Sequence, residues 1–402
     1  MELIIRTDAV ASKQWLNKVL MNDYTLINEK IPKAGSPNFL NLTEKLKNTL
    51  RLDKPDIIIS KIKNGLEIPL VSIELSKCKL QTQHIEQRMA RIVAAAENGI
   101  PAIFICGKNL IGTDGKNVPF DPKHYDLMYK IGNINKVPTF FYHWPTRGKM
   151  YIDEPGISGS PPINNTEIQK AIIMIKTLIN EEDNLSRTHS YFDNEIIENE
   201  FSNMKLKSEG KKYDIYKMAF KINGEPKKRS TLLEINTNEL ENFLYEYMER
   251  DSTWIKKTIN NFPKRILARE KTIIFKPNNT ESRMFYKSGD PYVGMIASFD
   301  YAFCRSGPTV DQRYKNLVYM PLNKDDRYMK KTLAKGDGKS NGFNDFYKKK
   351  CPFKSSEVEK VQDQFNIAHH LQYGCTFTKI KPMKIYSNFT DLMVFKDSLL
   401  VF

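Results

Sequence analysis

Residues 54–79 read KPDIIISKIKNGLEIPLVSIELSKCK, and this stretch decides the fold of the N-terminal half. Two runs rich in β-branched residues, 56–62 and 66–75, flank the pair Asn64-Gly65. An Asn-Gly pair between two such runs is the strongest short-range signal for a hairpin with a two-residue type I′ turn. The sequence therefore predicts two antiparallel strands joined by a tight turn.

A helix and a buried strand are predicted directly after the hairpin. Residues 81–98 place apolar side chains on one side of a helix, and Gly99 and Pro101 suit its end. The wholly apolar run 102–107 is typical of a strand buried in a mixed sheet. Weaker patterns predict further helices and strands in this half, at 10–21, 42–50, 139–143 and 166–180. We therefore expect an α/β domain over 1–180.

The hairpin brings two acidic residues close together at the outer ends of its strands. With the Asn-Gly pair in the turn, Asp56 lies opposite Ile73, one residue from Glu74. A one-residue bulge or a diagonal contact would bring both carboxylates to one cation. Adjacent carboxylates repel unless a cation lies between them, and oxygen-only ligands suit Mg²⁺. We therefore predict that Asp56 and Glu74 bind Mg²⁺, which can polarise a phosphodiester and activate an attacking water.

Pro55-Asp56, the hairpin, Glu74 at a strand end, and the helix and strand that follow together resemble the PD-(D/E)xK nuclease superfamily. This superfamily includes most type II restriction endonucleases, and the resemblance covers roughly residues 1–145. It implies a catalytic core with a restriction endonuclease-like mixed sheet flanked by helices. It also implies a Mg²⁺-dependent endonuclease that hydrolyses phosphodiester bonds in double-stranded DNA, with sequence-specific type II restriction as the favoured role. Such enzymes often act as homodimers, so that both strands are cut.

The sequence departs from the family pattern at the lysine. The family places a lysine two residues after the acid, where this chain has Ser76. Lys77 points to the opposite face of a regular strand, but it could reach the acids if the strand ended or bulged at Ser76. Lys79 could reach them from the start of the helix. Lys77 is the favoured catalytic lysine and Lys79 the alternative, and solvated surface lysines remain the competing interpretation.

A polar stripe runs along the predicted helix. Gln83, Gln87 and Arg91 follow one another at intervals of four residues, with Arg88 adjacent. The stripe could face the scissile phosphate or the minor groove of DNA. The solvent-facing side of an amphipathic helix is the favoured interpretation.

Positive charge is concentrated in the second half of the chain. Residues 201–402 hold 37 Lys and Arg against 23 Asp and Glu, a balance of +14, whereas the first 200 residues hold 25 against 24, a balance of +1. A basic region of this kind is typical of a polyanion partner. Mixed helix and strand patterns predict a basic α+β domain over 231–402 that binds and recognises DNA, joined to the first by a linker or irregular connection over 181–230.

Several other classes of protein are not expected. The N-terminus carries a charge where the apolar core of a secretory signal should lie, and no apolar stretch approaches the ~20 residues that span a bilayer. Five scattered cysteines form no disulfide framework, so a cytoplasmic protein without a membrane partner is expected. The spacing of Cys351, His369, His370 and Cys375 matches no standard zinc finger.

Two other functions remain open from the sequence. One is a nuclease of repair or phage defence that recognises DNA structure or modification instead of a specific sequence. The other is a catalytically inactive DNA-binding protein, which Ser76 makes credible.

Overall fold

The chain folds into two compact units in the computed structural model, Met1–Lys212 and Tyr213–Phe402. The structure describes residues 1–33, 36–77, 83–107, 109–111, 117–147, 150–185, 188–213, 231–248, 250–276, 293–320, 369–370, 381–395 and 399–402. Within these ranges, no helix combines the length and the apolar character needed to cross a membrane.

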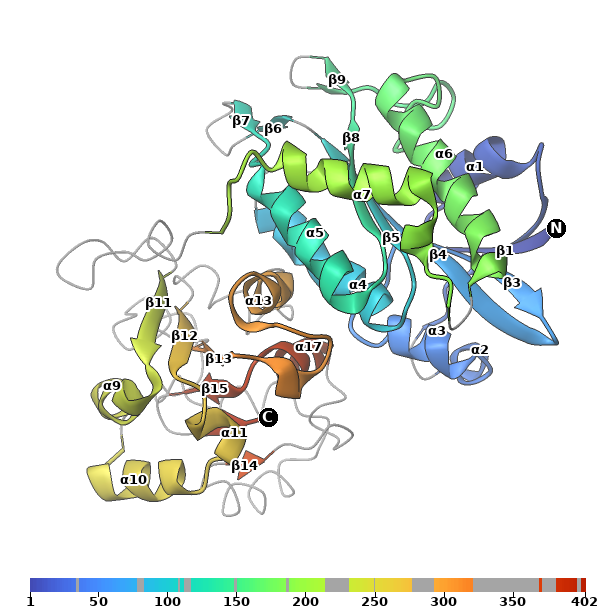
Figure 1. The fold of residues 1–402 in the computed structure, drawn as a ribbon. Helices are drawn as coiled ribbons and strands as arrows, with labels where there is room; N and C mark the ends of the chain where they lie inside the picture. Colours follow the sequence, from blue (N-terminus) through green and yellow to red (C-terminus); the bar gives the residue numbers. More distant parts are fainter. Residues whose placement is uncertain are drawn as a thin grey trace, which may run out of the picture. The chain divides into compact units, whose positions relative to one another are not determined.

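A six-stranded mixed sheet forms the centre of the first unit (Figure 1). Its spatial order is β2 (Thr25–Lys30), β1 (Glu2–Thr7), β3 (Ile57–Lys63), β4 (Leu66–Ser76), β5 (Ala102–Gly107) and β8 (Thr139–Trp144). Strands β1, β3 and β4 are antiparallel neighbours, whereas β4, β5 and β8 run parallel. The parallel strands are linked through helices, as parallel pairs require.

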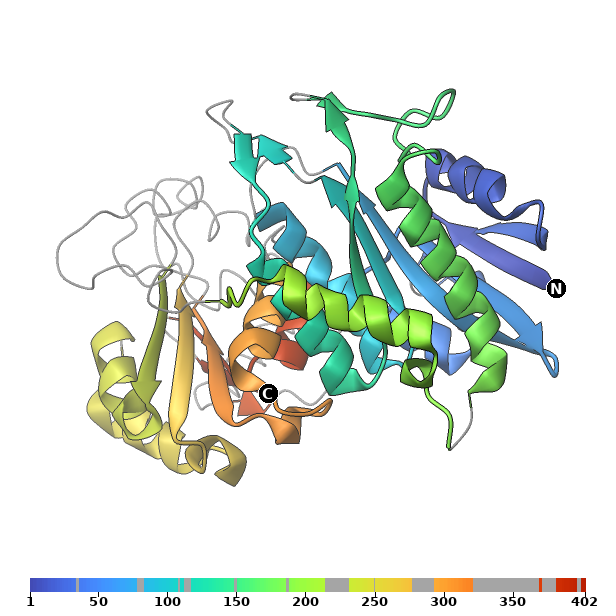
Figure 2. The same ribbon diagram turned by 45° about the horizontal axis from the view of Figure 1, so that its top comes forward.

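Helices cover the sheet of the first unit on both sides (Figure 2). Helices α4 (Gln83–Glu97) and α5 (Lys123–Asn135) pack against β4, β5 and β8 on one side, and α6 (Thr166–Glu181) packs against β4 and β8 on the other. Helix α1 (Val10–Leu20) packs against β1. The first unit is therefore an α/β core with a mixed sheet flanked by helices, as the sequence predicts.

The hairpin has the predicted turn. Asn64 has a φ of 54° and Gly65 a φ of 76°, so both central residues lie in the left-handed region that a type I′ turn needs. Lys63 pairs with Leu66 directly across the turn. The predicted strand over 102–107 is also confirmed, as β5.

The first unit is longer than expected. Helix α7 (Glu195–Lys207) lies within the range 181–230, which the sequence analysis assigns to a linker. It packs against α5, α6 and β8 through the buried side chains of Ile197, Phe201 and Met204. The division between the units, at Lys212–Tyr213, lies within the range 181–230 expected for the boundary, but α7 belongs to the first unit and is not an irregular connection.

The second unit also contains a six-stranded mixed sheet, with helices α9 (Leu240–Tyr247), α10 (Ser252–Asn260), α11 (Lys264–Leu267), α13 (Val293–Phe299) and α17 (Lys381–Phe389). The order of the strands is β11 (Thr231–Asn236), β12 (Lys271–Lys276), β13 (Lys315–Tyr319), β15 (Leu392–Val394), β16 (Leu399–Val401) and β14 (His369–His370). An apolar cluster of buried side chains joins α9 and α10 to these strands.

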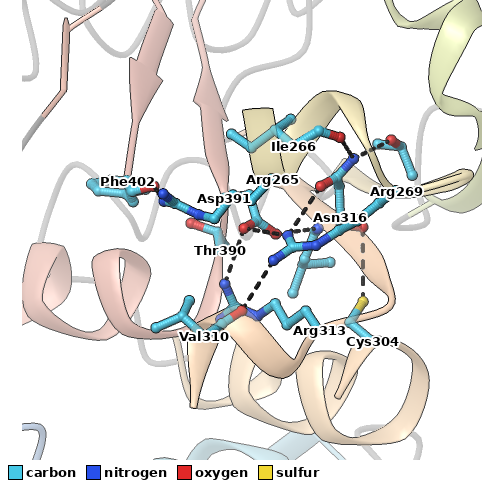
Figure 3. A network of polar contacts seen from close by, with 12 residues as sticks. Arg265, Ile266, Arg269, Cys304, Val310, Arg313, Asn316, Thr390, Asp391 and Phe402 are labelled. Atoms are coloured by element: carbon cyan, nitrogen blue, oxygen red, sulfur yellow. Dashed lines mark hydrogen bonds and ion pairs between the residues drawn. The ribbon is translucent and has the colours of Figure 1, made fainter. Parts of the chain in front are cut away.

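A buried network of ionic side chains also holds the second unit together (Figure 3). Arg269 donates to Asp391 at 2.7 Å and to Asn316 at 3.0 Å, and Arg313 lies 3.3 Å from the same Asp391 oxygen. Arg313 also donates to Asp300 at 2.8 Å. Three of these charged side chains, those of Asp300, Arg313 and Asp391, are fully buried. Because each charge is matched by an opposite charge and by hydrogen bonds, the network has the satisfied form that buried ions require.

Candidate functional site

Asp56 and Glu74 are aligned by a β-bulge in the hairpin. From the turn to the pair Ser60–Pro69 the two strands keep one register, and from Ile59–Val71 onward the register shifts by one residue. The extra residue follows Pro69, which has no N–H to donate and is tolerated inside a sheet mainly at bulges. A one-residue bulge is one of the two arrangements, with a diagonal contact, that were expected to bring the carboxylates together.

The bulge places the two acids at the same end of β3 and β4. Asp56 immediately precedes β3, and its Oδ2 accepts a hydrogen bond from the backbone N–H of Leu75 at 2.8 Å. Glu74 lies next to Leu75 in β4. The side chain of Asp56 is 25% exposed, whereas that of Glu74 is fully buried. The site therefore combines one accessible carboxylate with one that is excluded from water.

Burial dominates the electrostatics of Glu74. It raises the pKa of the carboxyl to about 7, although the charges of Arg91 and Arg88 act to lower it, and the nearby charge of Asp56 adds to the rise. Glu74 Oε1 accepts a hydrogen bond from Arg91 Nη1 at 2.7 Å and lies 2.9 Å from Arg88 Nη1. Glu74 Oε2 is buried and has no hydrogen-bond partner. Glu74 Oε2 therefore has no hydrogen bond that would offset its removal from water.

Arg91 connects three acidic residues. Besides its contact with Glu74, its Nε donates to Asp53 Oδ2 at 2.8 Å, and its Nη1 lies 4.0 Å from Asp56 Oδ1. Burial acts to lower the pKa of Arg91, but the charges of Glu74 and Asp53 raise it above its ordinary value. The guanidinium therefore stays protonated at every physiological pH.

The expectation that the helix stripe faces solvent is wrong for Arg91. Its side chain is only 16% exposed, because α4 packs this face against β4. The side chains of Gln83 and Gln87 lie outside the described residues. Asp53 is not among the site residues predicted from the sequence, although its position three residues before Asp56 is a usable signal.

The structure does not bring Lys77 to the two acids. Lys77 follows the last residue of β4, and its Nζ lies 2.5 Å from Asp153 Oδ2 and 5.3 Å from the centre of the Trp144 ring. Alternation along the strand places Ser76 on the same face as Glu74 and Lys77 on the opposite face. The catalytic role of Lys77 thus stays a prediction, and Lys79 lies outside the described residues.

The donor set of the site fits Mg²⁺. Glu74 Oε2 has no hydrogen bond, Asp56 Oδ1 has Arg91 Nη1 at 4.0 Å, and a hard cation accepts one or two carboxylates with water or phosphate completing its octahedron. Within the described ranges, no group of three or more His, Cys, Asp or Glu side chains could hold a metal ion. Any cation here therefore depends on ligands beyond Asp56 and Glu74.

The structure describes only two of the four residues considered for a zinc site. His369 and His370 form strand β14, whereas Cys351 and Cys375 lie outside the described residues. Cys106 and Cys304, which the structure describes, are buried free thiols.

No protein-family model matches this chain, and no curated protein or solved structure matches it either. The resemblance to PD-(D/E)xK nucleases therefore rests on the residues and geometry of the chain itself.

The raised pKa of Glu74 predicts a pH-dependent contribution to stability. The folded state binds this proton more tightly than the unfolded state, so the contribution is complete below about pH 4.5 and is lost as the pH rises to about 7. Glu74→Gln removes the titration. In the presence of a chelator, the unfolding free energy of the wild type relative to Glu74→Gln should fall by on the order of 3 kcal/mol across this window. Urea denaturation at stepped pH measures this difference, and a flat difference would contradict the burial of an ionisable Glu74.

The ion pair of Lys77 with Asp153 predicts that these two residues act together. If the protein cleaves DNA, as the sequence predicts, Lys77→Ala and Asp153→Asn should change the cleavage rate by similar, small factors, because each removes the same partly exposed pair. The measurement is a cleavage time course in Mg²⁺ for both variants. A loss of roughly 10²-fold for Lys77→Ala alone would instead identify Lys77 as the catalytic lysine.

Proposed function

We propose that this protein is a Mg²⁺-dependent endonuclease of the PD-(D/E)xK type that hydrolyses phosphodiester bonds in double-stranded DNA. The observation that carries the proposal is the bulge-aligned pair of Asp56 and buried Glu74, in which Glu74 Oε2 has no protein partner. Buried carboxylate oxygens usually have a hydrogen-bond partner. Asp126 Oδ2 and Asp153 Oδ1 also lack one, but Glu74 is fully buried and feels the charge of a second acid, Asp56, so a cation would stabilise both carboxylates.

The proposed roles follow from the positions of the side chains. Asp56 and Glu74 would hold Mg²⁺, which when bound polarises the phosphate and lowers the pKa of a water molecule. The backbone N–H of Leu75 fixes the orientation of the Asp56 carboxylate. The burial of Glu74 keeps competing water away from its oxygens and strengthens every electrostatic interaction at the site.

Double-stranded DNA as the substrate is supported by the charge of the second half. The balance of +14 in residues 201–402 suits contacts to the phosphate backbone, and a separate basic unit could select a sequence. Sequence-specific restriction is therefore the favoured role within this activity, with a homodimer as the arrangement that would cut both strands. A nuclease directed by DNA structure or modification would use the same site.

One observation favours a second function. Both Arg88 and Arg91 contact Glu74, and no lysine stands two residues after it. An inactive DNA-binding protein could keep such an ion pair purely for stability. Incubation of a phage genome with the protein and Mg²⁺ separates the candidates, because a sequence-specific enzyme gives discrete bands, a less selective nuclease gives a smear and an inactive protein leaves the DNA intact.

The proposal predicts that Asp56→Asn and Glu74→Gln each abolish Mg²⁺-dependent cleavage, because each removes the negative charge of one proposed ligand. The rate should fall by at least about 10²-fold, as expected when a group that organises the attacking water is lost. Asp8→Asn is the matched control, since Asp8 is an exposed acid that lies next to Asp56 only through its backbone. Cleavage by either site variant at the rate of Asp8→Asn would refute the proposed site.

A further inference from the structure

Among the residues that the structure describes, strand β4 places no positively charged side chain on the face of the sheet that carries Glu74. Ser76 occupies the position two residues after Glu74, and Lys77, which follows the strand, pairs with Asp153. Positive charge reaches the two acids from helix α4 instead. Arg91 Nη1 lies 2.7 Å from Glu74 Oε1 and 4.0 Å from Asp56 Oδ1.

A second guanidinium reaches the same carboxylate oxygen. Arg88 Nη1 lies 2.9 Å from Glu74 Oε1, and its side chain is 31% exposed, compared with 16% for Arg91. Both arginines thus bind one oxygen and leave Glu74 Oε2 without a partner. Both guanidinium contacts are therefore on one side of the carboxylate, and its other oxygen has no hydrogen bond to offset its charge.

The charges of the site point to the species that completes it. Asp53, Asp56 and Glu74 carry three negative charges when ionised, and Arg88 and Arg91 carry two positive charges, so the balance is −1. A divalent cation changes the balance to +1. One phosphodiester anion then brings it to zero, which is the condition that a poorly hydrated site favours.

We propose that Arg91, assisted by Arg88, exchanges partners during the reaction cycle. In the free protein the guanidinium of Arg91 binds Glu74. Once a divalent cation occupies Asp56 and Glu74, the same guanidinium binds a non-bridging oxygen of the DNA phosphate. This inference rests on the proposed function and adds a phosphate-binding residue to it. A permanently protonated guanidinium cannot take a proton from water, but its planar fork matches the oxygens of a phosphate.

If Arg91 exchanges partners, its contribution to the affinity for DNA should depend on whether a divalent cation is bound. The probe is a duplex that contains a mapped cleavage site, and Ca²⁺ serves as the divalent cation because it does not need to support cleavage. In a chelator, Arg91→Gln should bind this duplex within about twofold of the wild type, because Arg91 is then occupied by Glu74. In Ca²⁺ the variant should bind on the order of tenfold more weakly, as expected for the loss of one charge-assisted contact.

The salt dependence of binding gives an independent measurement. In Ca²⁺ the slope of log affinity against log salt should be smaller in magnitude by about one for Arg91→Gln, and in a chelator it should be unchanged. A guanidinium that acts only through its general charge would weaken binding equally in both conditions. Equal effects, or no effect in Ca²⁺, would overturn the exchange.

Two further variants keep the test decisive. Arg6→Gln is the matched control, because Arg6 also pairs with two carboxylates of the first unit, Glu29 and Glu67, and should show no metal-dependent effect. If Arg91→Gln does not fold, Arg88→Gln replaces it as the test variant, since Arg88 is more exposed and contacts the same oxygen of Glu74. It should show the same metal dependence at a smaller magnitude, and behaviour identical to Arg6→Gln would overturn the proposal.

Failure of this inference can be separated from failure of the proposed function. If the protein cuts no DNA, or if Asp56→Asn cuts as well as the wild type, the metal site itself is wrong and the exchange is wrong with it. If Asp56→Asn abolishes cleavage while Arg91→Gln behaves like Arg6→Gln, only the exchange is wrong.

Discussion

The side chain of Glu74 is excluded from water at the end of the central strand β4, and two arginines of helix α4 pair with its carboxylate. A buried carboxylate is costly unless a cation or hydrogen bonds compensate it. Helix α4 brings two arginines to one of its oxygens, and the bulge after Pro69 brings Asp56 to the same strand end. The hairpin, helix α4 and the bulge together therefore create a buried carboxylate whose negative charge is only partly balanced by its neighbours.

The buried ionic network of the second unit differs from the surroundings of Glu74. Burial acts to raise the pKa of Asp391, but Arg313 and Arg269 hold it below its ordinary value. Both of its oxygens accept hydrogen bonds, Oδ1 from arginine and Oδ2 from the N–H of Leu317. The pKa of Glu74 is raised instead, and one of its oxygens has no partner. The buried network of the second unit is thus fully paired at Asp391, whereas the carboxylate of Glu74 is only partly paired.

The hairpin, the helix over 83–97 and the strand β5 were predictable because their signals are local. Asn64 and Gly65 encode the turn, and the apolar run over 102–107 encodes the buried strand. The bulge was only partly predictable. Pro69 in a strand is a local sign of irregular pairing, but the register on either side depends on how the whole sheet packs.

The environment of single side chains was less predictable. The pattern of α4 could not show that Arg91 faces the sheet, because which polar residue of a stripe is buried depends on the tertiary partner. Strand β1 pairs with residues of β3 that are 50 or more positions away, and such non-local pairing leaves little trace in the local sequence. The position of Lys77 beside Asp153 likewise depends on a segment far along the chain.

The central claim is that Asp56 and Glu74 together bind a divalent cation. Anomalous diffraction from crystals of the protein grown with Mn²⁺ and a DNA duplex tests it most directly. We expect an anomalous peak within about 2.5 Å of Asp56 Oδ1 and Glu74 Oε2, the range of carboxylate coordination to hard divalent cations. A structure with Mn²⁺ bound elsewhere, or with Glu74 still bound only to Arg91 and Arg88, would contradict this metal site.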